Sequence, residues 1–355
     1  MKAKLLVLAL IAVIIITLGT GCGAQKEPAA DKSGDNSGTK TEDKAPVEQA
    51  QMRIGYLTGQ THPEHFEMTE LKKRLEAKVG DQLKVGTFGA GQLGNPGQLL
   101  QGLASGSIEA VIMPTAFYGG MAPEVTVLDL PGLFDGSDEA FDVMNSTSAG
   151  DGIGKALDAK GIKLLGYFYS ADKDIVATVP LKNKDSFKGR KIRTLAAPVA
   201  QDQINMLGGA GVPLDPGEVY TALQQKTIEG VFSDMHFWSS MKLYEVAKYR
   251  IEVPKGVIMS VLCVNKKWYE GLPSDVQKAL QETVQEVLPV AADHAKSLQQ
   301  DELKMLKDAG GETIDTDPEF NADLEKMYQE VTDKFVKEYP QTKAIIEEIK
   351  AASSK

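Results

Sequence analysis

The chain has 355 residues, which is long enough for two domains that each bury a hydrophobic core. Hydrophobic residues make up 42% and charged residues 25%, values that are ordinary for a globular protein. The formal net charge of -10 argues against a nucleic-acid partner, because the sequence has no basic stripe to neutralise phosphates. A small anionic ligand is still allowed, since one buried arginine can decide the local potential.

The first 21 residues have the pattern of a signal peptide. A positively charged start precedes a nearly all-aliphatic run from Leu5 to Leu18, which is too short to cross a bilayer. The L-G-T-G-C-G that follows resembles the lipobox of bacterial lipoproteins, with Gly19 in place of the usual leucine. We therefore predict a lipoprotein signal peptide over 1–21 and lipidation of Cys22, the first residue of the mature chain.

Residues 22–51 contain almost no large apolar side chains. Such a segment cannot bury enough surface to order itself, so we predict a flexible tether. Signal peptide, lipid and tether together predict an extracytoplasmic protein, anchored by its N-terminal lipid to the outer face of the cell membrane or facing the periplasm.

The rest of the chain is predicted to alternate strands with helices. The residue pattern predicts strands at 52–58, 82–88, 108–113, 162–169, 175–179, 191–193 and 256–265. It predicts helices at 66–79, 98–104, 138–145, 152–160, 218–225, 242–248, 274–306, 320–335 and 341–350. Asp215 and Ser274 are the expected N-caps of two of these helices. This alternation is typical of an α/β protein with largely parallel sheets.

The strand at 191–193 carries the most suggestive charges. Lys191 and Arg193 flank Ile192, so a strand would place both cations on one face. In an α/β fold a basic residue on such a strand can point into a cleft. There the planar guanidinium of an arginine can donate two parallel hydrogen bonds to a carboxylate. The alternative is a solvated edge strand with ordinary surface charges. The pattern alone does not separate the two readings.

Two further motifs suggest cofactors, but neither is complete. Residues Gly89 to Gly94 form a literal G-x-G-x-x-G, yet the strand that follows ends in Pro114, without the acid that a ribose requires. His62 and His65 resemble half of a metal site, but the chain has only four histidines. We therefore predict a structural glycine turn, histidines in a loop that faces a ligand, no cofactor and no metal.

No catalytic constellation emerges from the sequence. A G-x-S-x-G motif and a cysteine-protease signature are both absent from the 355 residues, and catalytic carboxylates cannot be chosen from 49 acidic residues. Cys263 lies in an apolar strand and is expected to be a small buried hydrophobe. We predict a protein that is not an enzyme.

Several segments taken together resemble one family. They are Q-L-G, G-S-I-E-A, P-E-V-T-V-L-D-L-P-G-L-F, F-K-G-R-K-I-R, L-G-G-A-G-V-P, E-V-Y-T-A-L-Q-Q-K-T-I-E-G-V and K-L-Y-E-V-A-K-Y. In this order and spacing they resemble the DctP-type extracytoplasmic solute receptors of tripartite ATP-independent periplasmic (TRAP) transporters. The resemblance covers residues 52–345, and the K-I-R strand and E-V-Y-x-A-L-Q are its most specific parts.

The resemblance implies a two-lobed α/β fold like that of periplasmic binding proteins, with central sheets flanked by helices and a long helix spanning both lobes. Lobe I would comprise 52–170 and 259–298, and lobe II 171–258 and 299–350. Such a receptor closes on a small organic acid in the interlobe cleft and delivers it to the TRAP membrane permease subunits. The alternatives are a receptor of another transporter class, such as the ABC type, or an exported enzyme that uses the same cleft.

The resemblance also assigns roles to particular residues. Arg193 would form a two-point salt bridge with the substrate carboxylate. Lys173 stands where many members have arginine, and lysine keeps the charge without the planar fork. Ser233 stands where many members have an asparagine that touches the ligand.

The wall after Ser233 departs most from the family pattern. Phe232, Phe237 and Trp238 are predicted to make it more aromatic, and a buried Asp234 would disfavour a nearby anion unless it faces away. The pattern favours an aromatic or keto acid over the dicarboxylates and sialic acids bound by well-known members.

The facing lobe is predicted to contribute the 56–65 and 89–95 loops to the closed cleft. Gln60, His62 and Gln92 are the candidate ligand contacts in these loops.

Overall fold

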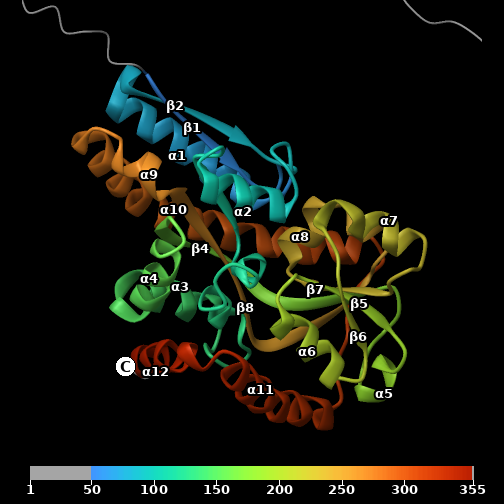
Figure 1. Cartoon of the computed structure of the whole chain (residues 1–355). Coiled ribbons are helices and arrows are strands. Elements are labelled where there is room, and N and C mark those ends of the chain that lie inside the picture. The colour runs from blue at the N-terminus through green and yellow to red at the C-terminus, as the bar shows by residue number, and fades with distance from the viewer. Residues whose placement is uncertain (1–48, 354–355) are drawn as a thin grey trace, which may run out of the picture. The chain divides into compact units, whose positions relative to one another are not determined.

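The computed structural model describes residues 49–353, and it forms a mixed sheet covered by helices (Figure 1). The predicted signal peptide, Cys22 and all but the last residues of the predicted tether lie outside the described residues. The nine strands are β1 (Ala50–Gly55), β2 (Leu83–Phe88), β3 (Ala110–Pro114), β4 (Ile162–Ala177), β5 (Lys191–Thr194), β6 (Ala210–Pro213), β7 (Gly230–Ser233), β8 (Tyr249–Asn265) and β9 (Glu312–Thr313). The tether prediction ran to residue 51, whereas β1 already begins at Ala50.

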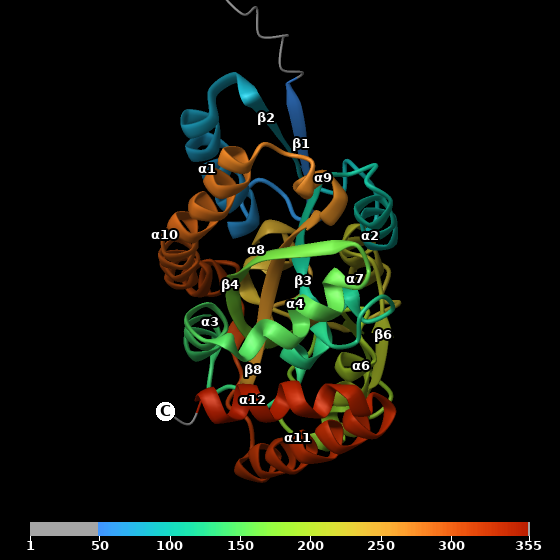
Figure 2. The same cartoon turned by 60° about the vertical axis from the view of Figure 1, so that its left-hand side comes forward.

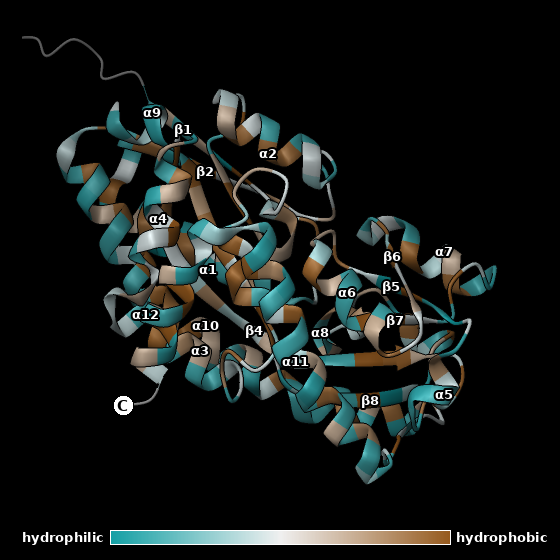
Figure 3. Cartoon of the chain, turned by 60° about the horizontal axis from the view of Figure 1, so that its bottom comes forward, coloured by the Kyte–Doolittle hydropathy of each residue, from teal (hydrophilic) through white to brown (hydrophobic). Residues whose placement is uncertain are grey.

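Twelve α-helices surround this sheet in residues 49–353. They are α1 (Pro63–Val79), α2 (Pro96–Ser105), α3 (Ser137–Ser146), α4 (Asp151–Asp158), α5 (Lys184–Phe187), α6 (Pro198–Met206), α7 (Val219–Gln224), α8 (Met235–Ser240), α9 (Lys266–Glu270), α10 (Ser274–Asp308), α11 (Pro318–Glu338) and α12 (Lys343–Ser353). Both views place α11 and α12 at the end of the sheet opposite β1 and β2 (Figures 1 and 2). Hydrophobic residues concentrate on the strands, and hydrophilic ones on the surrounding helices (Figure 3).

The sheet has the order β2-β1-β3-β8-β4-β7-β5-β6, and β9 pairs with β8. The prediction of largely parallel sheets is only partly right. Parallel pairs join β1 to β2 and β3, and β5 to β6 and β7, but β8 and β4 lie antiparallel to their neighbours β3, β4 and β7. The two antiparallel strands therefore connect the two parallel halves.

Strands β4 and β8 are the longest in the sheet, with 16 and 17 residues. The sequence predicted two separate strands at 162–169 and 175–179, but β4 runs through both. Its pairing with β8 shifts register between Tyr169 and Ala171, which leaves Ser170 at an irregularity in the ladder. Such a bulge bends a strand without ending it. The bend explains why the residue pattern was interrupted there.

The long helix α10 packs along α1, β4 and α8. It has 35 residues and is therefore about 50 Å long. Ser274 is not its cap, since Pro273 occupies that position and no side chain caps the helix. Buried positions such as Val284, Val287 and Ala291 recur at helical spacing and face the core.

Three other helix predictions need correction. Helix α1 begins at Pro63 rather than Phe66, with His62 as its N-cap. The segment 242–248 is a 3-10 turn at Leu243–Glu245 followed by β8, because Lys242 has a left-handed backbone with φ of 55°. Asp215 makes no side-chain cap, and a 3-10 turn precedes α7.

Within residues 49–353, no helix combines the length and the apolar character needed to cross a membrane. Cys263 is fully buried in β8, as its apolar surroundings predicted, and burial raises the pKa of its thiol to about 12.

Candidate functional site

Arg193 lies in the interior of the sheet rather than at an edge. Its strand, β5, pairs with β6 on one side and with β7 on the other. Only 1% of the arginine is exposed, whereas Lys191 at the start of the strand is exposed. The solvated edge strand, which the sequence left open, is therefore wrong.

The Arg193 guanidinium is held from one side only. Its Nε donates to the Leu214 carbonyl at 3.1 Å, and its Cζ lies 5.0 Å from the centre of the Phe237 ring. Within residues 49–353, no protein acceptor forms a hydrogen bond with either terminal nitrogen. Burial lowers the pKa of Arg193 to about 10, although Asp234 and Asp215 oppose the shift. The group is therefore a buried cation whose two-pronged end has no hydrogen-bond partner in the described chain.

Arg193 lines a small cavity of about 20 Å³, the space of roughly one water molecule. Its lining comes from segments far apart in the chain: Leu57, Thr58, His62, Pro114, Phe117, Ser170, Arg193, Leu195, Pro216, Ser233, Asp234, Phe237 and Ile258. Apolar side chains make most of the wall and a few polar groups converge on it, which is the usual composition of a small-molecule site.

The wall opposite β5 is built by the start of α1. The Nδ1 atom of His62 accepts the Glu64 backbone N–H, so the ring hydrogen of neutral His62 is on Nε2. Burial and the neighbouring His236 lower the pKa of His62 well below its usual value. Thr58 and Ser260 donate to the two oxygens of Glu64, whose pKa burial raises to about 7. Thr58 and His62 therefore present polar, uncharged groups to the cavity near neutral pH, and Glu64 behind them titrates in that range.

Asp234 lies at the junction of β7 and α8. Its Oδ1 accepts the Phe237 backbone N–H at 2.7 Å and so caps α8. Burial raises the pKa of Asp234, while His236, the Phe237 N–H and Arg193 act in the opposite direction. The sequence left open whether this acid faces away from the ligand, and the structure includes it in the cavity lining.

His236 ties this wall to the central strands. It donates from Nε2 to the Ser170 carbonyl at 3.1 Å, and its Nδ1 lies 2.9 Å from the Glu302 carboxylate. Burial opposes protonation of His236, but Glu302, Asp234 and the Ser170 carbonyl outweigh it and raise its pKa. The bulge at Ser170, helix α8 and helix α10 are thus joined by one buried polar cluster.

A wider groove of about 450 Å³ adjoins the cavity. It lies between the glycine loop before α2 and the turn before α7, and it shares Leu57 and Pro216 with the cavity lining. The glycine loop is a turn, as predicted: Gly91 and Gly94 have positive φ, and a Cβ at Gly89 would lie 2.4 Å from the Tyr56 ring.

Of the nine residues proposed from the sequence to contact the ligand, the structure brings four into the cavity wall. These are His62, Arg193, Ser233 and Phe237. The sequence did not single out the other polar groups of the wall, Thr58 and Ser170. Ser170 was missed because the strand that contains it was predicted as two, whereas Thr58 had only its place in the 56–65 loop as a signal.

The other five residues are not in the cavity lining. The Lys173 ammonium donates to the Asp129 carbonyl at 3.0 Å and lies 3.8 Å from its carboxylate. Phe232 is buried in the core beneath Lys173, and Trp238 is buried with its Nε1 donating to the Ala247 carbonyl. Gln60 and Gln92 are exposed in their loops.

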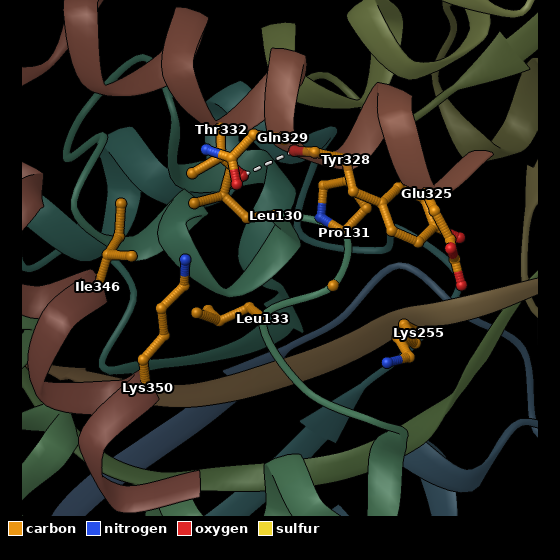
Figure 4. Close-up of a pocket in the computed structure, with 11 residues that line it drawn as sticks. Leu130, Pro131, Leu133, Lys255, Glu325, Tyr328, Gln329, Thr332, Ile346 and Lys350 are labelled. Atoms are coloured by element: carbon orange, nitrogen blue, oxygen red, sulfur yellow. Dashed lines mark hydrogen bonds between the residues drawn. The ribbon is translucent and has the colours of Figure 1, made fainter. Parts of the chain in front are cut away.

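A larger cavity of about 340 Å³ lies elsewhere, between α11, α12 and residues 130–133 (Figure 4). None of the residues proposed from the sequence lines it. Lys255 extends from the strand β8 toward this cavity, but its ammonium forms an ion pair with Asp135 at 3.1 Å. Volume alone therefore does not identify the binding site.

Within residues 49–353, no group of three or more histidine, cysteine, aspartate or glutamate side chains is arranged to hold a metal ion. His65 bonds instead to the Tyr56 hydroxyl at 2.6 Å.

The fold is thus a mixed sheet with long antiparallel connecting strands, and a buried arginine beside a cavity has no bonded acceptor on its terminal nitrogens within residues 49–353. Residues 54–338 match the family described as bacterial extracellular solute-binding protein, family 7 (DctP), and the chain belongs to this family. Its members are periplasmic or extracytoplasmic receptors, and the structural relatives are of the TRAP type.

Individual relatives agree with this assignment. The 2,3-diketo-L-gulonate-binding periplasmic protein YiaO of Escherichia coli is 29% identical over 295 residues, which cover 82% of this chain and 88% of the relative. A TRAP periplasmic solute-binding protein of Desulfovibrio salexigens with bound orotic acid has a TM-score of 0.82 at 25% identity, covering 86% of this chain and 99% of the other. One from Haemophilus influenzae with bound L-gulonate has a TM-score of 0.81 at 25% identity, covering 86% and 100%.

Proposed function

We propose that this receptor captures a small organic acid by its carboxylate, which the two terminal nitrogens of Arg193 bind in the closed cleft. The observation that supports the proposal is a guanidinium that is 1% exposed and has no protein acceptor on its terminal nitrogens in residues 49–353. A planar fork of two N–H groups matches the two oxygens of a carboxylate. Because the site is desolvated, such a pair contributes much more than it would in water.

The relatives support the same class of ligand. YiaO is named for binding 2,3-diketo-L-gulonate, and the two structural relatives hold orotic acid and L-gulonate. An aromatic or keto acid, which the sequence favoured, falls within the class proposed for this receptor.

The test begins with a thermal-shift screen of organic acids, since a ligand that binds only the folded form raises the melting temperature. For an acid that binds, Arg193→Ala is expected to weaken binding by about 2–5 kcal/mol in calorimetry. Arg190→Ala is the matched control, because Arg190 is three residues away, partly exposed and paired with Glu229. Equal affinity of Arg193→Ala and the unaltered protein for that acid would refute the role of Arg193.

We further propose that the receptor closes by bending where β4 and β8 pass between the predicted lobes. The predicted boundaries, 170/171 and 258/259, coincide with the register shift at which Tyr169 pairs with Met259 and Ala171 with Ile258. Bulges of this kind are frequent where strands bend beside functional sites.

Closure can be measured across the mouth of the cleft. Gln98 and Glu218 are exposed on opposite sides of the groove, and labels placed at both positions in a Cys22→Ser chain should approach each other when a binding acid is added. An unchanged label distance at saturating acid would contradict closure.

Delivery to TRAP permease subunits and anchoring through lipid on Cys22 are proposed from the family and from the N-terminal sequence. Neighbouring genes for two permease subunits without an ATPase would favour the TRAP type over an ABC receptor. Loss of membrane association in Cys22→Ser is the expected result for the anchor. Turnover of the bound acid by the purified protein would instead favour an exported enzyme.

A further inference from the structure

We propose that Asp234 makes this receptor selective for acids that carry one carboxylate together with a hydroxyl or N–H donor, and that it excludes dicarboxylates. The inference rests on the proposed function, in which Arg193 takes the first carboxylate. The proposed function concerns only that carboxylate, and the inference specifies which polar groups the rest of the ligand carries.

The cavity wall provides one permanent positive charge. Arg193 is the only lysine or arginine among the residues that line the cavity. Lys173, the second cation predicted for the site, is neutralised by Asp129, and Arg250 is paired with Asp174 at 2.9 Å. A ligand with two carboxylates would therefore bury its second charge without a cation, which is costly in a desolvated site.

Asp234 increases the cost of burying a second carboxylate, and it also requires a hydrogen-bond donor from the ligand. It is 5% exposed and lines the same cavity as Arg193. Its Oδ1 is bonded to the Phe237 N–H, whereas no donor within residues 49–353 is bonded to Oδ2. An aspartate oxygen in this position repels a second carboxylate and accepts a hydrogen bond from a hydroxyl or N–H group.

The charges around Asp234 favour its role as an acceptor. Burial raises the pKa of Asp234, whereas His236 on α8 and Arg193 on β5 stabilise the carboxylate. Glu302 on α10 opposes them, and Glu302 is itself bonded to His236. From the facing wall, His62 is neutral and Glu64 is held by two hydroxyl donors. The wall therefore places a carboxylate acceptor beside the cation that takes the ligand's own carboxylate.

A structural role for Asp234 is the competing explanation, because it also caps α8. Asparagine caps helices about as well as aspartate, so Asp234→Asn keeps the cap and removes only the charge. The variant thus separates ligand selection from folding, and equal melting temperatures without ligand would verify that the cap is intact.

The test compares acids of equal chain length by calorimetry: butyrate, succinate, 3-hydroxybutyrate and 4-hydroxybutyrate. For the unaltered protein we expect at least one hydroxy acid to bind about tenfold or more tighter than butyrate, and succinate to bind weakest. In Asp234→Asn we expect the preference for the hydroxy acid over succinate to shrink by about tenfold or more, which corresponds to about 1.4 kcal/mol.

Asp215→Asn is the matched control. Asp215 also acts on the charge of Arg193, but it lines the outer groove rather than the cavity. If Asp215→Asn changed the preference as much as Asp234→Asn, general charge and not contact would be responsible, and the inference would be overturned. Succinate that binds tightest to the unaltered protein and loses affinity in Arg193→Ala would overturn the inference while leaving the proposed function intact. If neither these acids nor any acid of the thermal-shift screen bound in an Arg193-dependent manner, the proposed function and the inference would fail together.

Discussion

Arg193 and Lys173 are two cations that are each only 1% exposed, yet the chain treats them differently. Lys173 has its counter-charge within the fold, where Asp129 supplies both a carbonyl and a carboxylate. Arg193 has a carbonyl on Nε, an aromatic ring beneath it and no acceptor on its terminal nitrogens in residues 49–353. A buried charge that the fold itself satisfies contributes to the structure, whereas one that the fold leaves open is suited to bind a ligand.

The largest effect is expected from breaking the satisfied pair. Lys173→Met leaves the buried Asp129 carboxylate without its cation and should lower the free energy of unfolding by about 3–5 kcal/mol at pH 8. Burial already raises the pKa of Asp129 to about 6, and loss of the lysine would raise this pKa further. The loss of stability should therefore be smaller at pH 5, where Asp129 can be protonated.

Chemical denaturation of Lys173→Met at the two pH values measures this effect. The double variant with Asp129→Asn removes both charges and should regain much of the lost stability. If Lys173→Met were as stable as the unaltered protein at pH 8, the two cations would not differ in the way the geometry indicates.

Glu64 shows a second way in which the fold accommodates a buried ionisable group, namely by favouring its protonated, neutral form. Its pKa is about 7 in the folded chain, compared with an ordinary value of 4.5, so the folded state holds the proton more tightly. The free energy of unfolding should therefore fall as the pH rises from 4.5 to 7, by about 3 kcal/mol from this group. Glu64→Gln, which cannot ionise, should remove that part of the pH dependence.

Denaturation of Glu64→Gln at pH 4.5 and pH 8 gives the measurement, with the exposed Glu348→Gln as the control. An equal pH dependence in Glu64→Gln and the unaltered protein would show that Glu64 is not the titrating group.

The smallest change in stability is expected at Arg193. Arg193→Met removes a charge that has no ion pair within 4 Å among residues 49–353, so the free energy of unfolding without ligand should change by about 1 kcal/mol or less. The same variant should lose the rise in melting temperature that a binding acid causes. A loss of stability as large as that of Lys173→Met would mean that the fold depends on Arg193 in the same way.

The sequence was sufficient for much of the fold because its local patterns and the tertiary structure agree. The apolar spacing of α1 and α10 and the strand that carries Arg193 were found close to their observed positions. The sequence predicted two strands, at 162–169 and 175–179, because the bulge at Ser170 interrupts the alternation of residues on which the prediction depends. The 242–248 helix was wrong because the left-handed backbone at Lys242 and the pairing of β8 outweighed local propensity.

For the site, too, the sequence predicted some features and the fold decided others. The alternation of Lys191, Ile192 and Arg193 and the family resemblance identified Arg193 from sequence. They gave Arg193 the two-point contact and Lys173 a charge without the planar fork, but they did not show that Lys173 is neutralised within the fold. The difference depends on Asp129, which is 44 residues from Lys173 in the chain but bonded to it in the fold.

By itself the sequence determined the family and the alternation of strands and helices, and it predicted one arginine as the contact for a carboxylate. These follow from periodicity and residue chemistry over short stretches. Only the tertiary structure decided that Lys173 is neutralised, that Phe232 and Trp238 belong to the core, and that Asp234 lies in the cavity wall. Whether a buried charge is satisfied depends on groups that chain folding brings together, and no local pattern records those partners.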